Sequence, residues 1–369
     1  MQKLNKQDII DILYGCAVLG TGGGGNLQAG IDMMQEDFDA GRTLNLIDVK
    51  DLPDDCIVAT PYGCGAPSAS TREPEYNPDR KLTRIEYPPA VLAFQSLEEF
   101  LGKKIYAVSS TELGGMNTAE ALHIACLLNR PLVDADPAGR SVPELIHSTF
   151  YLKDRPIHPM AVATWFGDVI ILKEVADDFR AEALVRSMAC VSGDEVSVCD
   201  HPMTGDQYRR SVIPGAISYA WKIGKILRKT KEDGCDAAQA IAEAAGGAVL
   251  FRGRVKNLCS QCRDGFDCGE TLLEGTGSYA GETYRIQFKN ENLIACRNDK
   301  TDVTVPDLIC MVDKNGNPMT NPDFSPGDEM NVFALPAPEI WTGEDGLKIL
   351  GPSYFGIDEP YIPFQQRTR

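Results

Sequence analysis

The sequence has no long apolar run and little positive charge. Of its 369 residues, 36 are lysine or arginine and 53 are aspartate or glutamate, which gives a net charge of −17. Nucleic acids and anionic membrane surfaces bind clustered lysine and arginine, so this balance disfavours both as partners. No apolar stretch reaches the ~18 residues that a membrane-spanning helix needs. The composition therefore predicts a soluble, acidic globular protein.

A secretion signal is also missing. The first residues, MQKLNKQDIIDILYGCAV, do not follow the basic, apolar, small order of a signal peptide, and they have the periodicity of an amphipathic helix. Without such a signal, the 12 cysteines are expected to be reduced thiols in the cytoplasm. The length exceeds what one hydrophobic core normally fills, so we expect two domains.

Several motifs of known chemistry are absent. The four histidines form no H-x-x-x-H or H-x-H pair, and no G-x-S-x-G nucleophile elbow occurs. The glycine run GTGGGGN, residues 20–26, has neither a preceding strand nor a following Lys-Ser or Lys-Thr, which disfavours nucleotide binding.

The same glycine run lies between two helical stretches, 7–19 and 27–40. In that position its backbone N–H groups can form a cradle for an anion or a carbonyl oxygen. The alternative is a turn packed so closely that any side chain would clash. The cradle would consist of Gly22, Gly23, Gly24, Gly25 and Asn26.

Residues 111–147 hold the densest group of candidate functional residues. We expect a short apolar helix at 118–128, a strand at 132–133, and a helix that begins at Val142-Pro143-Glu144. Ligands of open α/β sheets bind at strand ends and helix starts, and carboxylates beside an arginine suit acid–base chemistry. The polar residues at such positions are Glu112, Asn117, Asp134, Asp136, Arg140 and Glu144.

Two questions about this group stay open at the level of sequence. Asp134 and Asp136 can instead cap the next helix, with Arg140 neutralising them. His147 follows Glu144 by three residues, so it either joins the carboxylates as a base or is simply exposed.

Alternating strands and helices predict an α/β domain over residues 1–165, with an open, mostly parallel sheet. Strands are expected at 44–49, 56–60 and 104–109, a helix at 90–101, and a hairpin around Gly167-Asp168. Beyond Ala248, short alternating strands separated by turn residues predict a mainly β domain over 166–369. This second domain would carry a helical insert at about 208–246.

Three cysteines form the pattern C-x2-C-x5-C in what we interpret as a loop: Cys259, Cys262 and Cys268. Together with a distant fourth ligand they could hold zinc or an iron–sulfur cluster. Nearby arginine and lysine residues could equally lower a thiol pKa and make one cysteine a nucleophile. Inert packing is the third possibility.

The chain resembles a known family, first catalogued as a domain of unknown function and named for S-methyl-thiohydantoin desulfurase. The resemblance rests on the ordered strings GTGGGGN, CGAP, ELGGMN, PLVDADPAGRSVPE, NENLIA, VPDLICMVD and GPSYFGID, which span nearly the whole chain. The pattern V-D-x-D-x-x-G-R-x-x-P-E, which starts at Val133, is the most specific part. The resemblance implies an α/β N-terminal domain and a largely β C-terminal domain.

It also implies hydrolytic removal of sulfur from a five-membered S-methylated thiohydantoin ring, and an association with hydantoinase/oxoprolinase-type enzymes. On that basis we assign Asp134 or Asp136 as general base, Glu144 as its acid partner, and Arg140 as a charge stabiliser. The substrate would be bound by Gly22, Gly23, Gly24, Gly25, Asn26, Gly65, Glu112 and Asn117.

Two other classes of function remain. The chain could be a non-catalytic or regulatory subunit of a hydantoinase-type partner, or an enzyme with Cys259 or Cys262 as nucleophile. A homo-oligomer and a bound metal, zinc above all, are both compatible with the sequence.

Overall fold

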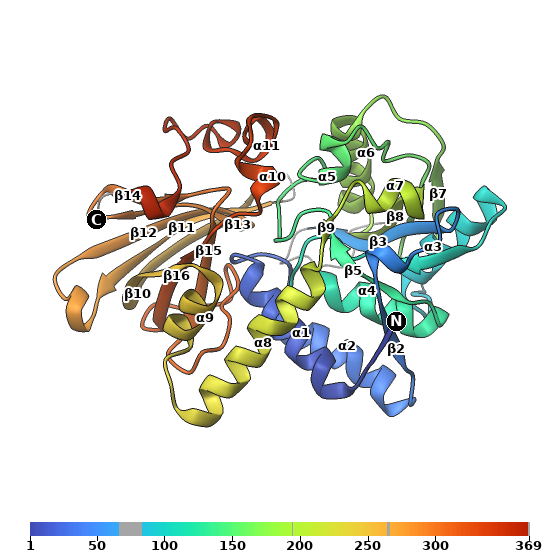
Figure 1. Ribbon diagram of the computed structural model, residues 1–369. Coiled ribbons are helices and arrows are strands. Elements are labelled where there is room, and N and C mark those ends of the chain that lie inside the picture. Colours follow the sequence, from blue (N-terminus) through green and yellow to red (C-terminus); the bar gives the residue numbers. More distant parts are fainter. Residues whose placement is uncertain (66–82, 194, 264–265, 368–369) are drawn as a thin grey trace.

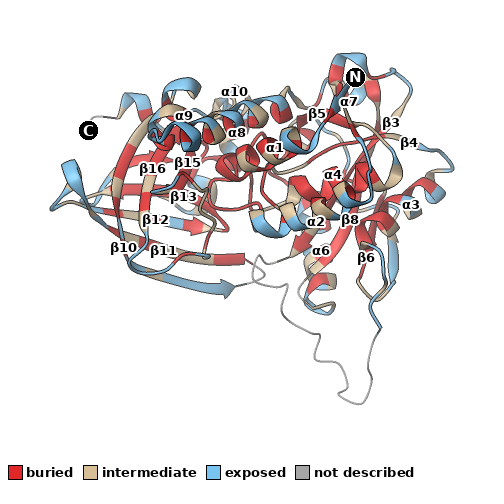
Figure 2. Ribbon diagram, turned by 90° about the horizontal axis from the view of Figure 1, so that it is seen from below, coloured by how far each residue is buried: buried red, intermediate tan, exposed pale blue. Residues whose placement is uncertain are grey.

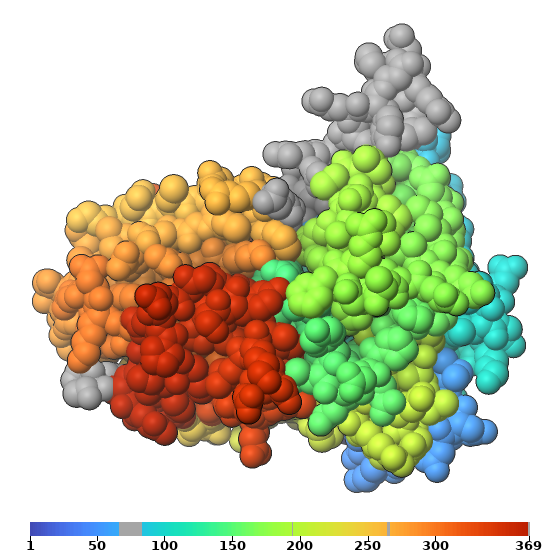
Figure 3. Space-filling model, turned by 90° about the horizontal axis from the view of Figure 1, so that it is seen from above, coloured from blue at the N-terminus to red at the C-terminus, as the bar shows by residue number. Residues whose placement is uncertain are grey.

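The computed structural model describes residues 1–65, 83–193, 195–263 and 266–367. Two β-sheets lie side by side, with helices packed around and between them (Figure 1). In the space-filling view, the green segment around residues 150–200 lies against the orange and red C-terminal part (Figure 3). Within these ranges, no helix is both long and apolar enough to cross a membrane.

The first sheet is mixed. Its centre is parallel, with β2, β5, β4 and β3 adjacent in that order, whereas β1 at one edge and β8, β6 and β7 at the other are antiparallel to their neighbours. A short strand, β9, pairs with β5. The strands are β1 (Gln2–Leu4), β2 (Leu44–Asp48), β3 (Ile57–Gly65), β4 (Ile105–Val108), β5 (Leu132–Asp136), β6 (Met160–Ala163), β7 (Val169–Leu172), β8 (Glu195–Thr204) and β9 (Ile213–Pro214).

Local sequence signals set the helix ends around this sheet. Helix α1 begins at a capping box in which the side chains of Asn5 and Asp8 each accept a hydrogen bond from the other's backbone N–H. Helix α3 has a proline in its first turn and ends at Gly102, whose φ is +62°. The helices are α1 (Lys6–Leu19), α2 (Leu27–Asp39), α3 (Pro89–Leu101), α4 (Asn117–Leu128), α5 (Thr149–Leu152), α6 (Asp178–Cys190) and α7 (Gly205–Arg209).

The second sheet is antiparallel throughout, in the order β14-β13-β12-β11-β10-β16-β15. Two helices, α8 (Ala216–Asp233) and α9 (Ala237–Ala245), precede it in the chain, and α10 (Glu339–Thr342) and α11 (Glu344–Leu350) follow it. The strands are β10 (Ala248–Arg263), β11 (Phe266–Gly275), β12 (Thr283–Lys289), β13 (Glu291–Arg297), β14 (Lys300–Thr304), β15 (Leu308–Asp313) and β16 (Glu329–Leu335).

Close packing of α1 against α8 joins the two parts. A Cβ atom on Gly15 would lie 1.7 Å from the Ala220 carbonyl oxygen, and one on Gly224 would lie 1.7 Å from the Asp11 carbonyl oxygen. The helix backbones are therefore in contact at both points, which only glycine permits. Figure 2 shows buried residues that continue from the first sheet through α1 to β15 and β16, so one core serves both parts.

The fold class predicted from sequence is confirmed: an α/β part with a mixed, mostly parallel sheet and a mainly β part. However, the first sheet extends past residue 165, where the sequence analysis placed the domain boundary. Strand β8 pairs with β3 and β9 with β5, so strands as far as Pro214 complete the first sheet. These pairings join segments that lie far apart in the sequence, which local patterns do not reveal.

One predicted helix is wrong. Residues 142–148 form turns, and the short helix α5 begins only at Thr149. Glu144 in these turns bonds Lys289 and Tyr354 of the second part, and such long-range contacts override the helical preference of Val-Pro-Glu.

Candidate functional site

A cavity of about 180 Å³ lies where the two parts meet. The turn after α1, the end of β3, the loop before α4, helix α6 and the start of β13 all contribute to its wall. Six of the eight residues predicted to bind substrate line it: Gly24, Gly25, Asn26, Gly65, Glu112 and Asn117.

The glycine run is both a tight turn and part of the cavity wall. Gly24 has a φ of +79°, and a Cβ atom on it would lie 2.4 Å from the Cα atom of Gly114. Its carbonyl oxygen accepts hydrogen bonds from the backbone N–H groups of Met116 (2.9 Å) and Asn117 (3.3 Å). The close-packing interpretation therefore holds, and the same packing exposes Gly24 and Gly25 to the cavity.

Gly22 and Gly23 do not line the cavity. The Gly22 carbonyl accepts a hydrogen bond from the Asn321 backbone N–H (2.8 Å), and a Cβ atom on Gly23 would meet Glu291 at 1.8 Å. The second part of the protein therefore covers this half of the predicted cradle.

Glu112 lies in the loop before α4 and lines the cavity. Its backbone is left-handed, with a φ of +57°, which is strained for a residue with a side chain. The Asn117 side-chain amide donates a hydrogen bond to Glu112 Oε2 at 3.1 Å. Burial, reinforced by the negative charge of Glu291, raises the pKa of Glu112 well above its ordinary value. Glu112 therefore holds its proton to a higher pH than a glutamate in water does.

Glu291, at the first position of β13, lines the same cavity as Glu112 and is only 2% exposed. Its Oε1 accepts a hydrogen bond from Ser141 Oγ at 2.8 Å, and its Oε2 has no hydrogen-bond partner among the described residues. Burial raises the pKa of Glu291 to about 7, although the hydrogen bond from Ser141 and the charge of Arg140 oppose this. A carboxyl with this pKa can accept and release a proton near neutral pH.

Two more carboxyls line another part of the cavity. Glu120 on α4 accepts a hydrogen bond from Ser197 Oγ at 3.4 Å, and burial together with the charge of Glu195 raises its pKa to about 7. Burial also raises the pKa of Glu195. Burial therefore raises the pKa of all four glutamates in the cavity wall, so each keeps its proton to a higher pH than a glutamate in water does.

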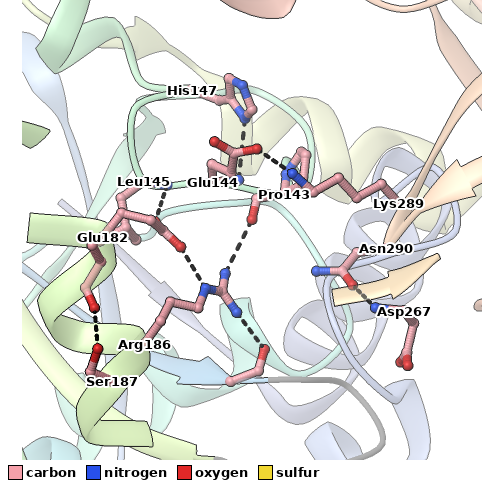
Figure 4. A network of polar contacts seen from close by, with 12 residues as sticks. Pro143, Glu144, Leu145, His147, Glu182, Arg186, Ser187, Asp267, Lys289 and Asn290 are labelled. Carbon is pink, nitrogen blue, oxygen red and sulfur yellow. Dashed lines mark hydrogen bonds and ion pairs between the residues drawn. The ribbon is translucent and has the colours of Figure 1, made fainter. Parts of the chain in front are cut away.

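Arg186 on α6 provides positive charge in the wall of the same cavity. Figure 4 shows its contacts with Glu182 and Pro143. Its Nε donates to Glu182 at 2.5 Å, and its two terminal nitrogens donate to the carbonyl oxygens of Gly65 (3.3 Å) and Pro143 (3.2 Å). The guanidinium also lies 4.2 Å from the ring centroid of Phe266, which belongs to the second sheet. Arg186 therefore holds the end of β3 and the turn at Pro143 at the cavity, and joins the two parts.

The four residues predicted to be catalytic lie elsewhere. Asp134 accepts hydrogen bonds from the backbone N–H (2.8 Å) and the hydroxyl (2.6 Å) of Ser218, in the first turn of α8. Asp136 is fully buried and accepts from the backbone N–H groups of Ala138 and Gly139. Neither aspartate caps the next helix of the chain, as the alternative expected, because Asp134 bonds α8 and Asp136 bonds a turn. Neither side chain lines the cavity among the described residues.

Arg140 is fully buried and acts as a cross-link. It donates hydrogen bonds to Thr21 Oγ1 (2.8 Å), to the Pro306 carbonyl (2.8 Å) and to the Ser141 carbonyl (2.9 Å). Burial lowers its pKa to about 10, so it stays charged at neutral pH and opposes the raised pKa of Glu291. Its influence on the site is therefore indirect.

Glu144 and His147 form part of the contact between the two parts (Figure 4). Lys289 and Tyr354 both donate to the Glu144 carboxylate, and these bonds lower its pKa although burial opposes them. His147 Nδ1 accepts from the Glu144 backbone N–H at 3.2 Å, and burial lowers the His147 pKa to about 3. His147 is therefore buried and a weak base, not an exposed residue.

The cysteines predicted as metal ligands lie on strands, not in a loop. Cys259 and Cys262 are exposed on β10, three residues apart, so their side chains point to opposite faces of the strand. Cys268 lies on β11, opposite Gln261. Within the described ranges, no three histidine, cysteine, aspartate or glutamate side chains form a group that could hold a metal ion.

Sequence reasoning missed the residues that dominate the electrostatics of the site: Glu120, Arg186, Glu195 and Glu291. A signal existed for two of them. Glu120 is the single acidic residue in an otherwise apolar helix, and Glu291 stands in a polar triplet immediately before an apolar strand.

Comparison with known families accounts for this architecture. Residues 7–174 match the model of the S-Me-THD-like, N-terminal domain, and residues 176–364 match that of the S-Me-THD-like, C-terminal domain. The chain belongs to the S-Me-THD-like family. The resemblance noted in the sequence is thereby confirmed, and the cavity lies between the two family domains.

One solved structure is similar over almost its full length. It is the crystal structure of a protein from Chromobacterium violaceum, with a TM-score of 0.79, 22% sequence identity, and coverage of 98% of this chain and 100% of that chain. At that identity the likeness establishes a shared fold. No curated protein matches the chain.

Proposed function

We propose that this S-Me-THD-like protein hydrolyses a small five-membered cyclic amide or thioamide, of the S-methyl-thiohydantoin type, in the cavity between its two domains. The observation that carries the proposal is the presence of Glu112 and Glu291, two glutamates with raised pKa values, in the wall of one cavity of about 180 Å³. That volume is below the usual range for drug-sized ligands and suits a single small ring. Family membership supports the choice of ring.

In the proposed reaction, water adds to the ring carbon that carries the S-methyl group. Glu291 in its ionised form accepts a proton from the water through Oε2, and Glu112 in its protonated form donates a proton to the ring nitrogen. The intermediate then collapses to a carbonyl and breaks its C–S bond. Its hydroxyl proton returns to Glu112, and the proton on Glu291 goes to the departing methanethiolate.

Other residues of the cavity would bind and orient the ring. Asn117 offers an amide group for the ring N–H and C=O positions, and the backbones of Gly24 and Gly25 allow the ring to approach closely. The Asn26 side chain instead caps α2 and donates a hydrogen bond to Asp323. Arg186 lies close enough to stabilise negative charge that develops on the ring.

The test is a panel of S-methyl-thiohydantoins, thiohydantoins and hydantoins, assayed with and without added divalent metal. A thiol reagent detects released methanethiol, and chromatography detects the opened or desulfurised ring. For a confirmed substrate, we expect Glu291→Gln to lower kcat by about 100-fold or more, since general acid–base groups contribute ~10²–10⁴. Glu344→Gln, at an exposed side chain, is the matched control.

An unchanged kcat in Glu291→Gln would overturn the assignment of the base. No turnover of any ring, together with co-purification of a hydantoinase-type protein, would instead favour a non-catalytic subunit.

A further inference from the structure

A second, much smaller cavity lies beside the first. Its volume is about 20 Å³, and Tyr62, Glu112, Val142 and Leu145 line both cavities. A space of this size accommodates about one water molecule, provided that enough polar groups surround it. The small cavity is therefore next to the proposed catalytic acid, on the side away from the substrate.

The wall of the small cavity contains polar atoms that lack partners. Thr60 Oγ1 and His201 Nε2 are buried and have no hydrogen-bond partner among the described residues. Thr60 and Asp200 are directly opposite one another in the β3–β8 ladder, so the two strands bring these groups together. Buried polar atoms normally form hydrogen bonds to protein or to ordered water, so these two atoms indicate a site for an ordered water molecule.

His201 belongs to a hydrogen-bonded group that reaches the first cavity. Asp200 Oδ1 lies 2.8 Å from His201 Nδ1, and Tyr62 Oη donates to Asp200 Oδ2 at 2.6 Å. The carboxylate therefore orients the imidazole with a proton on Nδ1, which leaves Nε2 free to accept or carry a second proton. The ring of Phe150 packs on the imidazole with centroids 4.7 Å apart and holds it in place.

The other titratable groups around His201 are few. Glu112, Glu144 and His147 line the small cavity with it, and His147 is neutral because burial lowers its pKa to about 3. Asp178, at the start of α6, interacts electrostatically with His201 and with His158. Asp178 is buried, whereas His158 is half-buried, so the group approaches the protein surface at His158.

We propose that the small cavity holds one ordered water molecule, and that this water connects Glu112 to His201 so that the Tyr62–Asp200–His201 group exchanges protons with the active site. When Glu112 has lost its proton to solvent, the water donates a proton to its carboxylate and takes one from Nε2 of His201. Solvent then returns a proton to His201 from the side of Asp178 and His158. A Glu112 side chain that was ionised before the reaction can thus regain its proton while substrate fills the first cavity.

The existence of the water does not depend on the proposed function, whereas its catalytic use does. The first experiment is a crystal structure of the full chain at a resolution that shows ordered water. We expect a water peak within hydrogen-bond distance of Thr60 Oγ1 and His201 Nε2. We also expect that peak to be lost in Thr60→Val, which keeps the shape of the side chain. An empty cavity in the unmodified protein would overturn the proposal.

The second experiment measures kcat and KM against pH for Thr60→Val and His201→Gln with a confirmed ring substrate. We expect kcat to fall about 10-fold at alkaline pH, where Glu112 more often loses its proton to solvent and must regain it before it can act, with KM and the acidic side of the profile unchanged. A purely structural role would lower kcat equally at every pH and would overturn the relay. A water peak without turnover of any ring would refute the proposed function and the relay's catalytic use, and leave the water site standing.

Discussion

A Cβ atom on residue 23 would lie 1.8 Å from Oε1 of Glu291, so Gly23 leaves the space that the Glu291 side chain fills. The first residue belongs to the turn after α1 and the second to the start of β13. The glycine run of one domain therefore positions the carboxyl of the other. This contact links the turn between α1 and α2, which is far from β13 in the sequence, to a carboxyl in the cavity wall.

Replacement of Gly23 by alanine should displace Glu291. The φ of Gly23 is not in the left-handed region, so alanine fits the backbone and clashes only with the Glu291 side chain. We expect Gly23→Ala to lower kcat/KM about as much as Glu291→Gln does, on the order of 100-fold. Steady-state kinetics on a confirmed substrate measure this.

The matched control is Gly343→Ala, since Gly343 is exposed and a Cβ atom there would meet nothing closer than 3.9 Å. The double variant Gly23→Ala/Glu291→Gln should be no worse than either single variant, because both changes remove the same group. Additive losses would contradict this coupling.

The pH dependence of activity should be bell-shaped. Glu291 must be ionised to accept a proton, so kcat/KM should rise with pH up to its pKa of about 7. Glu112 must be protonated, and burial raises its pKa well above the ordinary value, so kcat/KM should fall again at higher pH, where Glu112 ionises. Kinetics of Glu291→Gln should lack the rising limb. If the rising limb persists in Glu291→Gln and disappears in Glu120→Gln, the base is Glu120 instead.

Glu120 should make the folded state less stable at alkaline pH. Its pKa is about 7 in the folded protein against 4.5 for the free side chain, so the folded state binds this proton more tightly. The resulting stability is fully present below about pH 4.5 and is lost as the pH rises through about 7. Glu120→Gln should therefore raise the free energy of unfolding at pH 8.5 by on the order of 1–3 kcal/mol, and change it little near pH 5.

Urea denaturation at the two pH values measures this difference. Glu344→Gln, at an exposed carboxylate, should change stability at neither pH. An equal effect of Glu120→Gln at both values would show that the side chain acts through packing and not through its charge.

Sequence reasoning succeeded where the determining interactions are local. Helices 7–19, 90–101 and 118–128 were predicted within about two residues, because their apolar periodicity and end signals lie within the segment itself. The same is true of the glycine turn, which adopts positive φ angles where the run of glycines permits them.

It was wrong where a distant segment decides the structure. Asp134 and Asp136 stand beside Arg140 in the sequence, yet Asp134 caps α8, which begins eighty residues later, and Arg140 bonds the Pro306 carbonyl. Glu291 could not be linked to Gly23 or Ser141 without the fold, because no local pattern reports contacts between residues 150 or more positions apart. The hydrophobic pattern predicts the elements, and their pairing creates the site.

Replacement of Arg140 should lower the stability of the fold, because this buried side chain cross-links the two parts and does not line the cavity. Its removal leaves the Thr21 hydroxyl and the Pro306 carbonyl without their buried donor. We expect Arg140→Ala to lower the free energy of unfolding by about 3 kcal/mol, measured by urea denaturation, because unpaired buried polar groups each cost ~1–3 kcal/mol. Arg140→Lys should lose less, since it keeps the charge but not the planar set of donors.

Arg180→Ala is the control for Arg140, because Arg180 is exposed on α6. If Arg140→Lys keeps normal stability but abolishes turnover, Arg140 acts directly on the substrate, as the sequence pattern first indicated.

The exposed cysteines should react with an alkylating reagent, and their alkylation should leave the activity unchanged. Cys190, Cys235, Cys259 and Cys262 are exposed, whereas most of the others are buried, and burial raises the pKa of Cys64 in the cavity wall to about 12. Iodoacetamide should therefore label these four thiols in the folded protein, and mass spectrometry of peptides should find Cys64 unlabelled until the protein unfolds. Loss of activity in step with labelling of Cys259 or Cys262 would restore the cysteine nucleophile. Protection of both thiols that is removed by a chelator would reveal a metal on β10.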